Sequence, residues 1–308
     1  KKRKQKIIRA NQILISNELS AADLLSLSKT KLSGLVSVMG GPEGHFAIVA
    51  RSLSIPTVVG VKNFLKNIKN NEKIVLDGEK GLLIKNPTNQ TVNFYKKKIE
   101  EQKNKDKKLN YLKKIIPKTQ DNVRIKIEAN IDNSDEAKES MKRGIDGIGL
   151  YRSEYLFMNK KRMPSENAQY DSLKKTLKYL KGKPLTIRTL DIGNDKKVPS
   201  IEKYLNKSPN PALGLRAIRL TLAFPKIFRR QISAILRASR HGNVRIMLPM
   251  VSNVSELTEA KKLIDNVRKD LLLKKVKISS TPPDVGVLIE TPAAMRAPRE
   301  APANWTMW

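Results

Sequence analysis

The sequence contains no cysteine, and this absence excludes disulfide bonds and thiolate metal sites. Aromatic residues make up only 5% of the chain, which leaves few rings on which nucleic-acid bases could stack. No apolar run approaches the length that a membrane-spanning helix needs, and no signal-peptide pattern is present. We therefore expect a cytoplasmic protein that does not cross a membrane.

Positive charge, by contrast, is abundant. The chain has 61 Lys and Arg residues against 29 Asp and Glu residues, which gives a net charge of +32. Such an excess is typical of nucleic-acid-binding proteins, but a lysine-rich composition set by an AT-biased genome also explains it. The basic residues are spread along the chain, with local density at 1–6 and 95–118. With so few aromatic residues, we do not expect nucleic acid as the partner.

The first part of the chain, residues 1–90, predicts a compact mixed α/β domain. Short β-like runs alternate there with helical patterns, and residues 73–87 predict a hairpin with DGEKG as its turn. A long and highly charged helical pattern follows. We assign residues 91–120 to a linker helix.

Residues 121–296 show a different pattern, in which apolar strands alternate with capped helices. Residues 210–242 predict one or two of these helices. The predicted strands are 123–131, 145–154, 184–192, 244–251 and 284–291. This alternation indicates a parallel sheet covered by helices, and about five such strands correspond to the first part of a (β/α)₈ barrel. Residues 297–308 have no helix or strand period, so we expect an irregular tail there and regard it as a candidate non-native segment.

Charged residues stand at the carboxyl ends of these predicted strands, where (β/α)₈ barrels hold their active sites. They are Arg152, Glu154, Arg188, Asp191 and Glu290. Taken singly, each is explained by a buried ion pair as well as by function. Taken together, guanidinium groups that bind carboxylate or phosphate, and a carboxylate that can hold Mg²⁺, favour a substrate with both phosphate and carboxylate.

One of the two histidines, His45, lies between a glycine-rich turn and a helical pattern in GGPEGHFAIVA. A neutral imidazole is nucleophilic near neutral pH, and a helix N-terminus stabilises added negative charge. His45 is therefore a candidate phosphoryl acceptor. A histidine that caps the helix or packs beside it fits the same residues, and the motif alone favours that structural alternative.

Several stretches of the chain occur in an order that resembles one enzyme family. They are GGPEGHFAIVARSLSIPTVVG, GIDGIGLYRSEYLFM, TIRTLDIGNDK, NPALGLRAIR, ILRASRHGNVRIMLPMVS and GVLIETPAA, and they span the chain to about Arg296. On these motifs the sequence resembles Enzyme I of the phosphoenolpyruvate-dependent phosphotransferase system, with the nitrogen-regulatory branch as a candidate. The resemblance implies a swivelling β/β/α phosphohistidine domain at 1–90, N-terminally truncated. An incomplete phosphoenolpyruvate-binding barrel at 121–296 would follow it.

The resemblance also implies a reaction. A histidine takes the phosphoryl group of phosphoenolpyruvate, releases pyruvate and passes the group to the histidine-containing phosphocarrier protein (HPr), with Mg²⁺ as cofactor. By position, His45 matches that histidine, and Arg152 and Arg188 match the arginines that bind the phosphate of phosphoenolpyruvate. The remaining matches are Glu290, as one of two Mg²⁺ ligands, and Lys196 and Arg216, as further residues at the mouth of the barrel.

The histidine motif departs from the family, which has Thr-Ser where Glu43 and Gly44 stand here. The lost hydroxyl would normally hydrogen-bond near the imidazole or its phosphate. Glu43 would disfavour a phosphate toward which it pointed, and it would orient the neutral ring if it accepted the ring proton. The departure bears on the rate of transfer, and His45 keeps its assignment.

The resemblance implies further parts that these 308 residues do not contain. A helical domain that docks the phosphocarrier is expected before residue 1. The second Mg²⁺ ligand, another arginine and a cysteine that acts as an acid are expected beyond residue 308. The family forms a homodimer largely through that later half. We therefore expect this fragment alone to be close to inactive.

Two other functions are compatible with the sequence. Pyruvate phosphate dikinase and phosphoenolpyruvate synthase share the histidine domain and the barrel but add an ATP-grasp domain, and LYRSEYLF and TLDIGNDK favour Enzyme I over them. A non-catalytic basic remnant that binds a partner or nucleic acid is the second alternative. Nucleic-acid binding with a steep salt dependence would support that remnant.

Overall fold

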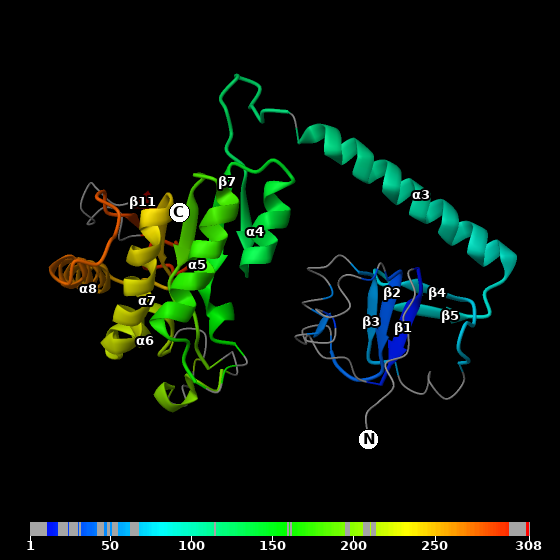
Figure 1. Ribbon diagram of the computed structural model, residues 1–308, viewed down its shortest axis with the longest axis horizontal. Helices are drawn as coiled ribbons and strands as arrows, with labels where there is room; N and C mark the ends of the chain where they lie inside the picture. The colour runs from blue at the N-terminus through cyan, green and yellow to red at the C-terminus, as the bar shows by residue number, and fades with distance from the viewer. Residues whose placement is uncertain are drawn as a thin grey trace. The chain divides into compact units, whose positions relative to one another are not determined.

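The computed structural model divides the chain into two compact units, Lys1–Leu109 and Asn110–Trp308 (Figure 1). The helix α3 (Asn89–Leu112) contains the point at which the chain passes from the first unit to the second. The residues that the structure describes are 11–17, 24, 30, 32–41, 46–47, 50, 55–61, 68–113, 115–158, 160, 162–194, 198–205, 210, 214–295 and 306–307.

The first unit holds a three-stranded parallel sheet of order β1-β2-β3 and a separate antiparallel hairpin, β4-β5. The strands are β1 Ile13–Ser16, β2 Gly34–Ser37, β3 Thr57–Val59, β4 Ile74–Asp77 and β5 Leu82–Lys85. The central strand β2 is buried along its whole length, as a parallel strand covered on both faces should be. Leu24, Leu35 and Ala50 form the core of this unit.

The hairpin predicted at 73–87 is confirmed, and its turn falls on the DGEKG residues. One oxygen of Asp77 accepts hydrogen bonds from the backbone N–H groups of Glu79 and Lys80, each at 3.1 Å. Lys98 of α3 donates to the carboxylates of Asp77 and Glu79, also at 3.1 Å each. Burial by itself would raise the pKa of Asp77, but these hydrogen bonds outweigh it and lower the pKa. Asp77 therefore stabilises the turn of the hairpin, and Lys98 connects this turn to α3.

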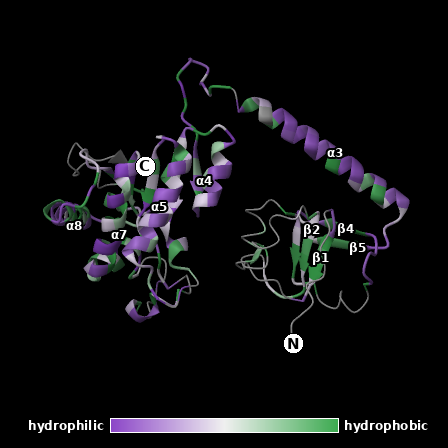
Figure 2. Cartoon of the chain, in the orientation of Figure 1, coloured by the Kyte–Doolittle hydropathy of each residue, from purple (hydrophilic) through white to green (hydrophobic). Residues whose placement is uncertain are grey.

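The linker helix α3 is polar along most of its length (Figure 2) and is shorter than the predicted range of 91–120. It ends at Leu112, a few residues before Pro117. The residue before a proline is driven out of the helical conformation, so the helix cannot continue through this point. The chain turns instead and forms a short antiparallel bridge between Lys118 and Arg124.

The second unit holds a six-stranded sheet of order β11-β10-β9-β8-β7-β6, in which every neighbouring pair is parallel. The strands are β6 Glu128–Ile131, β7 Gly147–Arg152, β8 Leu185–Arg188, β9 Val244–Leu248, β10 Asp284–Val287 and β11 Thr306–Met307. The helices are α4 Ser134–Met141, α5 Glu166–Leu180, α6 Ala217–Ala223, α7 Pro225–Ala238 and α8 Val254–Leu273, with 3₁₀ turns η2 Ser153–Leu156, η3 Glu202–Tyr204 and η4 Ser239–His241. The predicted alternation of parallel strands and helices is confirmed. Among the described residues, no helix is both long enough and apolar enough to span a bilayer.

The helices of this unit cover one face of the sheet. Strand order follows chain order from β6 to β11, so each crossover advances in the same direction. Right-handed crossovers that all advance the same way place their helices on one side. In agreement, α4 packs on α5, α5 on α7 and α7 on α8, in a row across the sheet (Figure 1). Strands and helices share one buried core, which includes Tyr151, Leu185, Phe228, Ile246 and Leu257.

The sheet curls toward its other face. Arg245 on β9 reaches Glu128 on β6, with 3.4 Å between Nη1 and Oε1, although β7 and β8 lie between those strands. Adjacent strands are about 4.8 Å apart, so a flat sheet would separate the two backbones by roughly 14 Å. Gly149 on β7 leaves room for this contact, since a Cβ there would lie 3.1 Å from the Cβ of Glu128.

Two segments differ from the sequence predictions. The strand predicted at 123–131 begins only at Glu128, and Ile125 and Ile127 before it are 45% and 50% exposed. Arg124 forms only an isolated bridge with Lys118, and no strand among the described residues pairs with the rest of this alternating run. The propensity of residues to form a strand depends on such neighbours. In the tail predicted to be irregular, residues 297–308, the two described residues form β11, because the outer edge of β10 offers unpaired backbone groups.

The helical segment predicted at 210–242 forms two helices. Phe224 has non-helical backbone angles, and Pro225 takes the first position of α7. A proline at that position costs no hydrogen bond, because the first N–H groups of a helix have no partner within the helix. The break lets α6 approach the carboxyl end of the sheet while α7 covers its face.

Close packing at the start of β7 gives a stability prediction. A Cβ on Gly147 would lie 2.6 Å from Pro184 Cγ and 2.9 Å from the Pro184 carbonyl oxygen. We expect Gly147→Ala to lower the free energy of unfolding of the second unit by about 1–3 kcal/mol, the usual cost of overpacking. Urea denaturation followed by circular dichroism measures this change. The control is Gly41→Ala, whose Cβ would meet no atom of the described residues within 4 Å. Equal effects of the two variants would contradict the packing at Pro184.

Candidate active site

The described charged residues that were predicted to line the mouth of the barrel include three near the carboxyl ends of strands in the second unit. Arg152 and Arg188 are the last residues of β7 and β8, and they pair in register. Met247 on β9 continues the same row. Glu290 lies in the segment that follows β10. Because the strands are parallel, these positions share one edge of the sheet, the edge at which barrel enzymes place their active residues.

Arg188 and Arg216 share two buried carboxylates. Arg188 Nη2 lies 2.5 Å from Glu154 Oε1 and 3.2 Å from Asp191 Oδ2. Arg216, the N-cap residue of α6, places its Nη2 2.8 Å from Asp191 Oδ1. The four side chains are at most 10% exposed. Breaking such a buried pair leaves an uncompensated charge and typically costs about 3–5 kcal/mol.

This cluster still has an unused donor. Among the described residues, none accepts a hydrogen bond from the buried Nε–H of Arg188. The buried hydroxyl of Thr189, the next residue, likewise has no hydrogen-bond partner in the described part of the chain. Buried polar groups are rarely left unpaired, and each one is costly. An anion bound at this edge would satisfy the guanidinium donor.

Gln231 on α7 joins the ends of β7 and β8, and the sequence analysis did not identify it. Its Oε1 accepts the backbone N–H of Leu190 at 2.9 Å, and its Nε2 donates to Ser153 Oγ at 3.0 Å. Ser153 follows Arg152 and Leu190 precedes Asp191, so Gln231 fixes the spacing of the two charged segments. A glutamine on the apolar face of an amphipathic helix was the available signal, because a buried amide needs partners.

Glu290 and Arg219 hold the segment after β9 from two sides. Glu290 Oε1 accepts the backbone N–H of Met250 at 3.0 Å, and Arg219 Nη1 donates to the Met250 carbonyl at 2.8 Å. Met250 has a φ of 57°, in the left-handed region that is costly for a residue with a side chain. Such a conformation persists where its surroundings fix it, and it is common at functional sites. The sequence analysis identified Glu290 but not Arg219.

The charges at this edge influence one another. Partial desolvation raises the pKa of Glu290, although the residue keeps an exposed surface. The hydrogen bond from Met250 acts in the opposite direction, the negative charge of Asp191 raises the pKa further, and Arg188 and Arg216 lower it. The net effect is a raised pKa. Glu290 therefore belongs to the same electrostatic cluster as the buried arginines.

The six predicted site residues are placed unequally. Arg188, Arg216 and Glu290 lie together. Arg152 instead points to the end of the neighbouring strand β6, where its Nη1 lies 3.3 Å from Asp132 Oδ1. The side chain of Arg152 is 41% exposed. His45 and Lys196 lie outside the described residues. The roles assigned to all six stay predictions.

The carboxylates at this edge fit a metal ion only if a bound substrate supplies further ligands. Within the described ranges, no group of three or more His, Cys, Asp or Glu side chains could hold a metal ion. Mg²⁺ does not need such a group, because it keeps several waters and binds through one or two carboxylates plus substrate phosphate oxygens. Glu290 fits as one such carboxylate, while Asp191 is committed to two arginines.

Comparison with known families agrees with this geometry. Residues 106–301 match the family described as "PEP-utilising enzyme, PEP-binding domain", which is more than half of the chain. The chain belongs to the family of phosphoenolpyruvate-utilising enzymes. Residues 8–81 match a second description, "PEP-utilising enzyme, mobile domain". The two matches therefore fall mainly in the two separate compact units.

Three curated relatives share the name phosphoenolpyruvate-protein phosphotransferase. The relative from Staphylococcus epidermidis is 38% identical over 287 residues, 93% of this chain and 50% of its own length. The relative from Priestia megaterium is 37% identical over 292 residues, which are 94% of this chain and 50% of that relative. The relative from Geobacillus stearothermophilus is 37% identical over 291 residues, which are 94% of this chain and 49% of that relative. These names confirm the resemblance to Enzyme I. The chain spans about half the length of the curated relatives it matches.

A solved structure of this family is also similar in sequence. It is titled "NMR solution structure of Enzyme I (nEIt) protein using two 4D-spectra" and is 34% identical, covering 31% of this chain and 39% of that one. The TM-score of 0.29 is too low for the superposition to inform the fold.

Proposed function

We propose that this protein takes the phosphoryl group of phosphoenolpyruvate onto His45 and passes it to HPr, releasing pyruvate. The observation that carries the proposal is the buried cluster of Arg188, Arg216, Glu154 and Asp191 at one edge of the sheet. The family match and the name of the relatives support it. That name also favours Enzyme I over the dikinase and synthase alternatives.

Phosphoenolpyruvate carries a phosphate and a carboxylate, and guanidinium groups bind both. In the proposed step, an imidazole nitrogen of His45 bonds to phosphorus as the bond from phosphorus to the enolate oxygen breaks. The enolate then takes up a proton at carbon and becomes pyruvate. Phosphoryl transfer is accelerated mostly by positioning and charge neutralisation. Arg152 and Arg188 would hold the phosphate, and Lys196 and Arg216 would complete the mouth.

Mg²⁺ belongs to the same proposal, with Glu290 as one of its ligands. Glu290 would hold the ion, whose positive charge would neutralise charge on the substrate. The exposed surface of Glu290 and its raised pKa support the assignment, because such a carboxylate gains from a nearby cation. The residue that would be the second ligand is expected beyond residue 308.

The raised pKa of Glu290 gives a pH prediction. Mg²⁺ binds the ionised carboxylate, so Mg²⁺-dependent binding of phosphoenolpyruvate should weaken as the pH falls, and the loss should begin at a higher pH than for an ordinary carboxylate. Glu290→Gln keeps an acceptor for the Met250 N–H but cannot ionise. We expect it to weaken Mg²⁺ binding at least about tenfold and to reduce the pH dependence to the part that comes from the second ionisation of the substrate phosphate. Calorimetric titrations from about pH 5 to about pH 8 measure both effects.

The raised pKa of Glu290 also determines how the stability of the folded chain depends on pH. Because the folded-state pKa of Glu290 is raised, the native state holds more protons than the unfolded state between the ordinary and the raised pKa. Stability is therefore lost as the pH rises through that window, and Glu290→Gln should melt no lower than the parent at neutral pH. The control is Glu259→Gln on α8, which should change neither property; a variant at Glu290 that behaves like this control would contradict the metal assignment.

The architecture proposed for the chain has two parts. The second unit would be the first part of an incomplete (β/α)₈ barrel, supported by its sequential parallel strands, its helices on one face and the contact of Glu128 with Arg245. The first unit would be the swivelling β/β/α phosphohistidine domain, supported by its own compact core and by the match to a mobile domain. In full length we propose a cytoplasmic homodimer. This chain alone, about half the length of its relatives, should release little pyruvate.

The proposed transfer is tested on the protein expressed from its complete reading frame. It is incubated with radiolabelled phosphoenolpyruvate and Mg²⁺, and the labelled peptide is identified. We expect an acid-labile phosphohistidine at His45 that purified HPr discharges. Label on another residue, or a protein that stays unlabelled although it binds phosphoenolpyruvate, would contradict the proposal. Labelling that requires ATP would indicate the dikinase alternative.

A further inference from the structure

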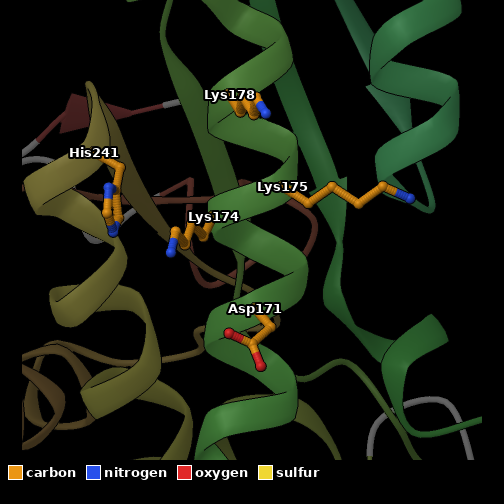
Figure 3. A pocket seen from close by; sticks show the side chains of 5 residues that line it. All are labelled: Asp171, Lys174, Lys175, Lys178 and His241. Carbon is orange, nitrogen blue, oxygen red and sulfur yellow. The ribbon is translucent and has the colours of Figure 1, made fainter.

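A cavity of about 450 Å³ opens beside α5 and η4 in the second unit (Figure 3). Its lining consists of one acid, Asp171, three lysines, Lys174, Lys175 and Lys178, and His241. Because η4 leads into the amino end of β9, the cavity lies toward the end of the sheet opposite the candidate active site. Its volume is in the range of small-molecule sites.

The positive charge around this cavity is not balanced by carboxylates. Within the part of the chain that the structure describes, Lys174, Lys178 and Arg240 form no ion pair with an acid. Lys175 differs, since it points away toward α4 (Figure 3) and its Nζ lies 2.9 Å from Asp135 Oδ1. Ammonium groups without a partner at the rim of a cavity favour an anionic ligand.

His241 faces Lys174 across the cavity (Figure 3). Arg240 Nε donates to His241 Nε2 at 3.0 Å, and the Tyr170 hydroxyl lies 2.9 Å from the same nitrogen. A guanidinium can only donate, so Nε2 is an acceptor and the ring is neutral in this arrangement. Burial lowers the pKa of His241, and the charges of Arg240 and Lys174 lower it further.

The wall behind His241 is fixed by a buried tyrosine. Tyr170 is 8% exposed, and the guanidinium carbon of Arg237 lies 4.4 Å from the centre of its ring. Lys174 and Arg240 lie 5.9 Å and 6.0 Å from the same ring centre. Cations at these distances are attracted to the ring face. Arg237 is also held by Glu166, so the wall is ordered before any ligand binds.

We propose that this cavity binds a phosphate-bearing small molecule through Lys174, Lys178 and the protonated ring of His241. An anion beside the ring would favour its protonated form and so reverse the effect of the surrounding cations. On protonation, Nε2 can no longer accept from Arg240, which becomes available to the same anion. Tyr170 and Lys174 from α5 and Arg240 beside it are the neighbours of His241, Arg237 from α7 packs on the Tyr170 ring, and Asp171 and Lys178 line the same cavity. None of them belongs to the candidate active site, so this inference does not depend on the proposed transfer.

The chain has only two histidines, and this makes a direct test possible. The ring-proton NMR signal of His241 is assigned with the variant His45→Ala. The 308-residue chain is titrated, at constant ionic strength and several pH values, with inorganic phosphate and separately with a nucleoside 5′-monophosphate. We expect a saturable shift of the His241 signal with at least one of them and a higher pKa of His241 in the bound state. The probe that saturates at the lower concentration identifies the form of phosphate.

Variants on α5 make the test specific. The double variant Lys174→Gln, Lys178→Gln should weaken binding at least about tenfold, since it removes both unpaired ammonium groups. Its control is Lys175→Gln, on the same helix, which should stay within about twofold because that ammonium is bound by Asp135. All three lysines are exposed, so the variants should fold. A shift that never saturates, that sodium chloride reproduces, or that Lys175→Gln reduces as strongly would overturn the inference.

Discussion

We expect His45→Ala to abolish the labelling of the protein by phosphoenolpyruvate, with a loss of at least about a thousandfold, the size expected when a nucleophile is removed. Within these 308 residues there is no cysteine and only one other histidine that could act as a nitrogen acceptor. That histidine, His241, lies toward the amino end of the sheet, and its Nε2 is occupied by Tyr170 and Arg240. The measurement is radiolabel incorporation by the protein from the complete reading frame.

The matched control for this variant is His241→Ala, which should keep full labelling. Binding of phosphoenolpyruvate, measured by calorimetry, should be unchanged in His45→Ala, because the proposed binding groups lie in the second unit. Label that persists without His45, or that disappears without His241, would contradict the assignment of the acceptor. Loss of binding together with label would indicate a folding defect and is checked by circular dichroism.

The second large effect concerns stability. Asp191→Ala removes the carboxylate that Arg188 and Arg216 share, and it leaves two guanidinium groups in a site where each side chain is 10% exposed. We expect the free energy of unfolding of the second unit to fall by about 3–5 kcal/mol, the usual cost of breaking a buried ion pair. For a unit of this size, that corresponds to a melting temperature lower by roughly 10 °C.

Thermal and urea denaturation of the 308-residue chain measure this effect. Asp265→Ala on the exposed side of α8 is the control, and it should change stability by less than about 0.5 kcal/mol. A loss at Asp191 below about 1 kcal/mol would mean that the two arginines are solvated or paired elsewhere. The cluster would then not be the rigid anion site that the proposed function needs.

Local sequence signals predicted much of the secondary structure. The hairpin at 73–87 was predictable because Asp77 and its neighbours form a turn from their own side chains and backbone. Strands β8 and β9 were predictable because each is a short, mostly apolar run between turn signals. Residues 123–127 alternate apolar and basic side chains, as a half-buried strand does, but they form no strand. A strand also requires a partner strand, which the local pattern does not reveal.

The residues of the candidate site also include some that the sequence could predict and some that it could not. Arg188, Asp191 and Glu290 were identifiable because charged residues that end apolar strands must converge at one edge of a parallel sheet. Gln231 and Arg219 were not, because their partners lie far away in the sequence: Gln231 bonds residues 41 and 78 positions away, and Arg219 one 31 positions away. Only the three-dimensional structure shows such pairs.

The most direct test of the central claim is a titration of phosphoenolpyruvate into the 308-residue chain with Mg²⁺, followed by ³¹P NMR. The parent is compared with Arg188→Lys, which keeps the charge but loses the planar guanidinium group. The control is Arg229→Lys on α7, whose ion-pair partner is Asp270 of α8. We predict saturable binding that Arg188→Lys weakens at least about tenfold and Arg229→Lys leaves unchanged. No saturable binding by the folded chain, or equal affinities for both variants, would contradict a phosphoenolpyruvate site at the carboxyl ends of these strands.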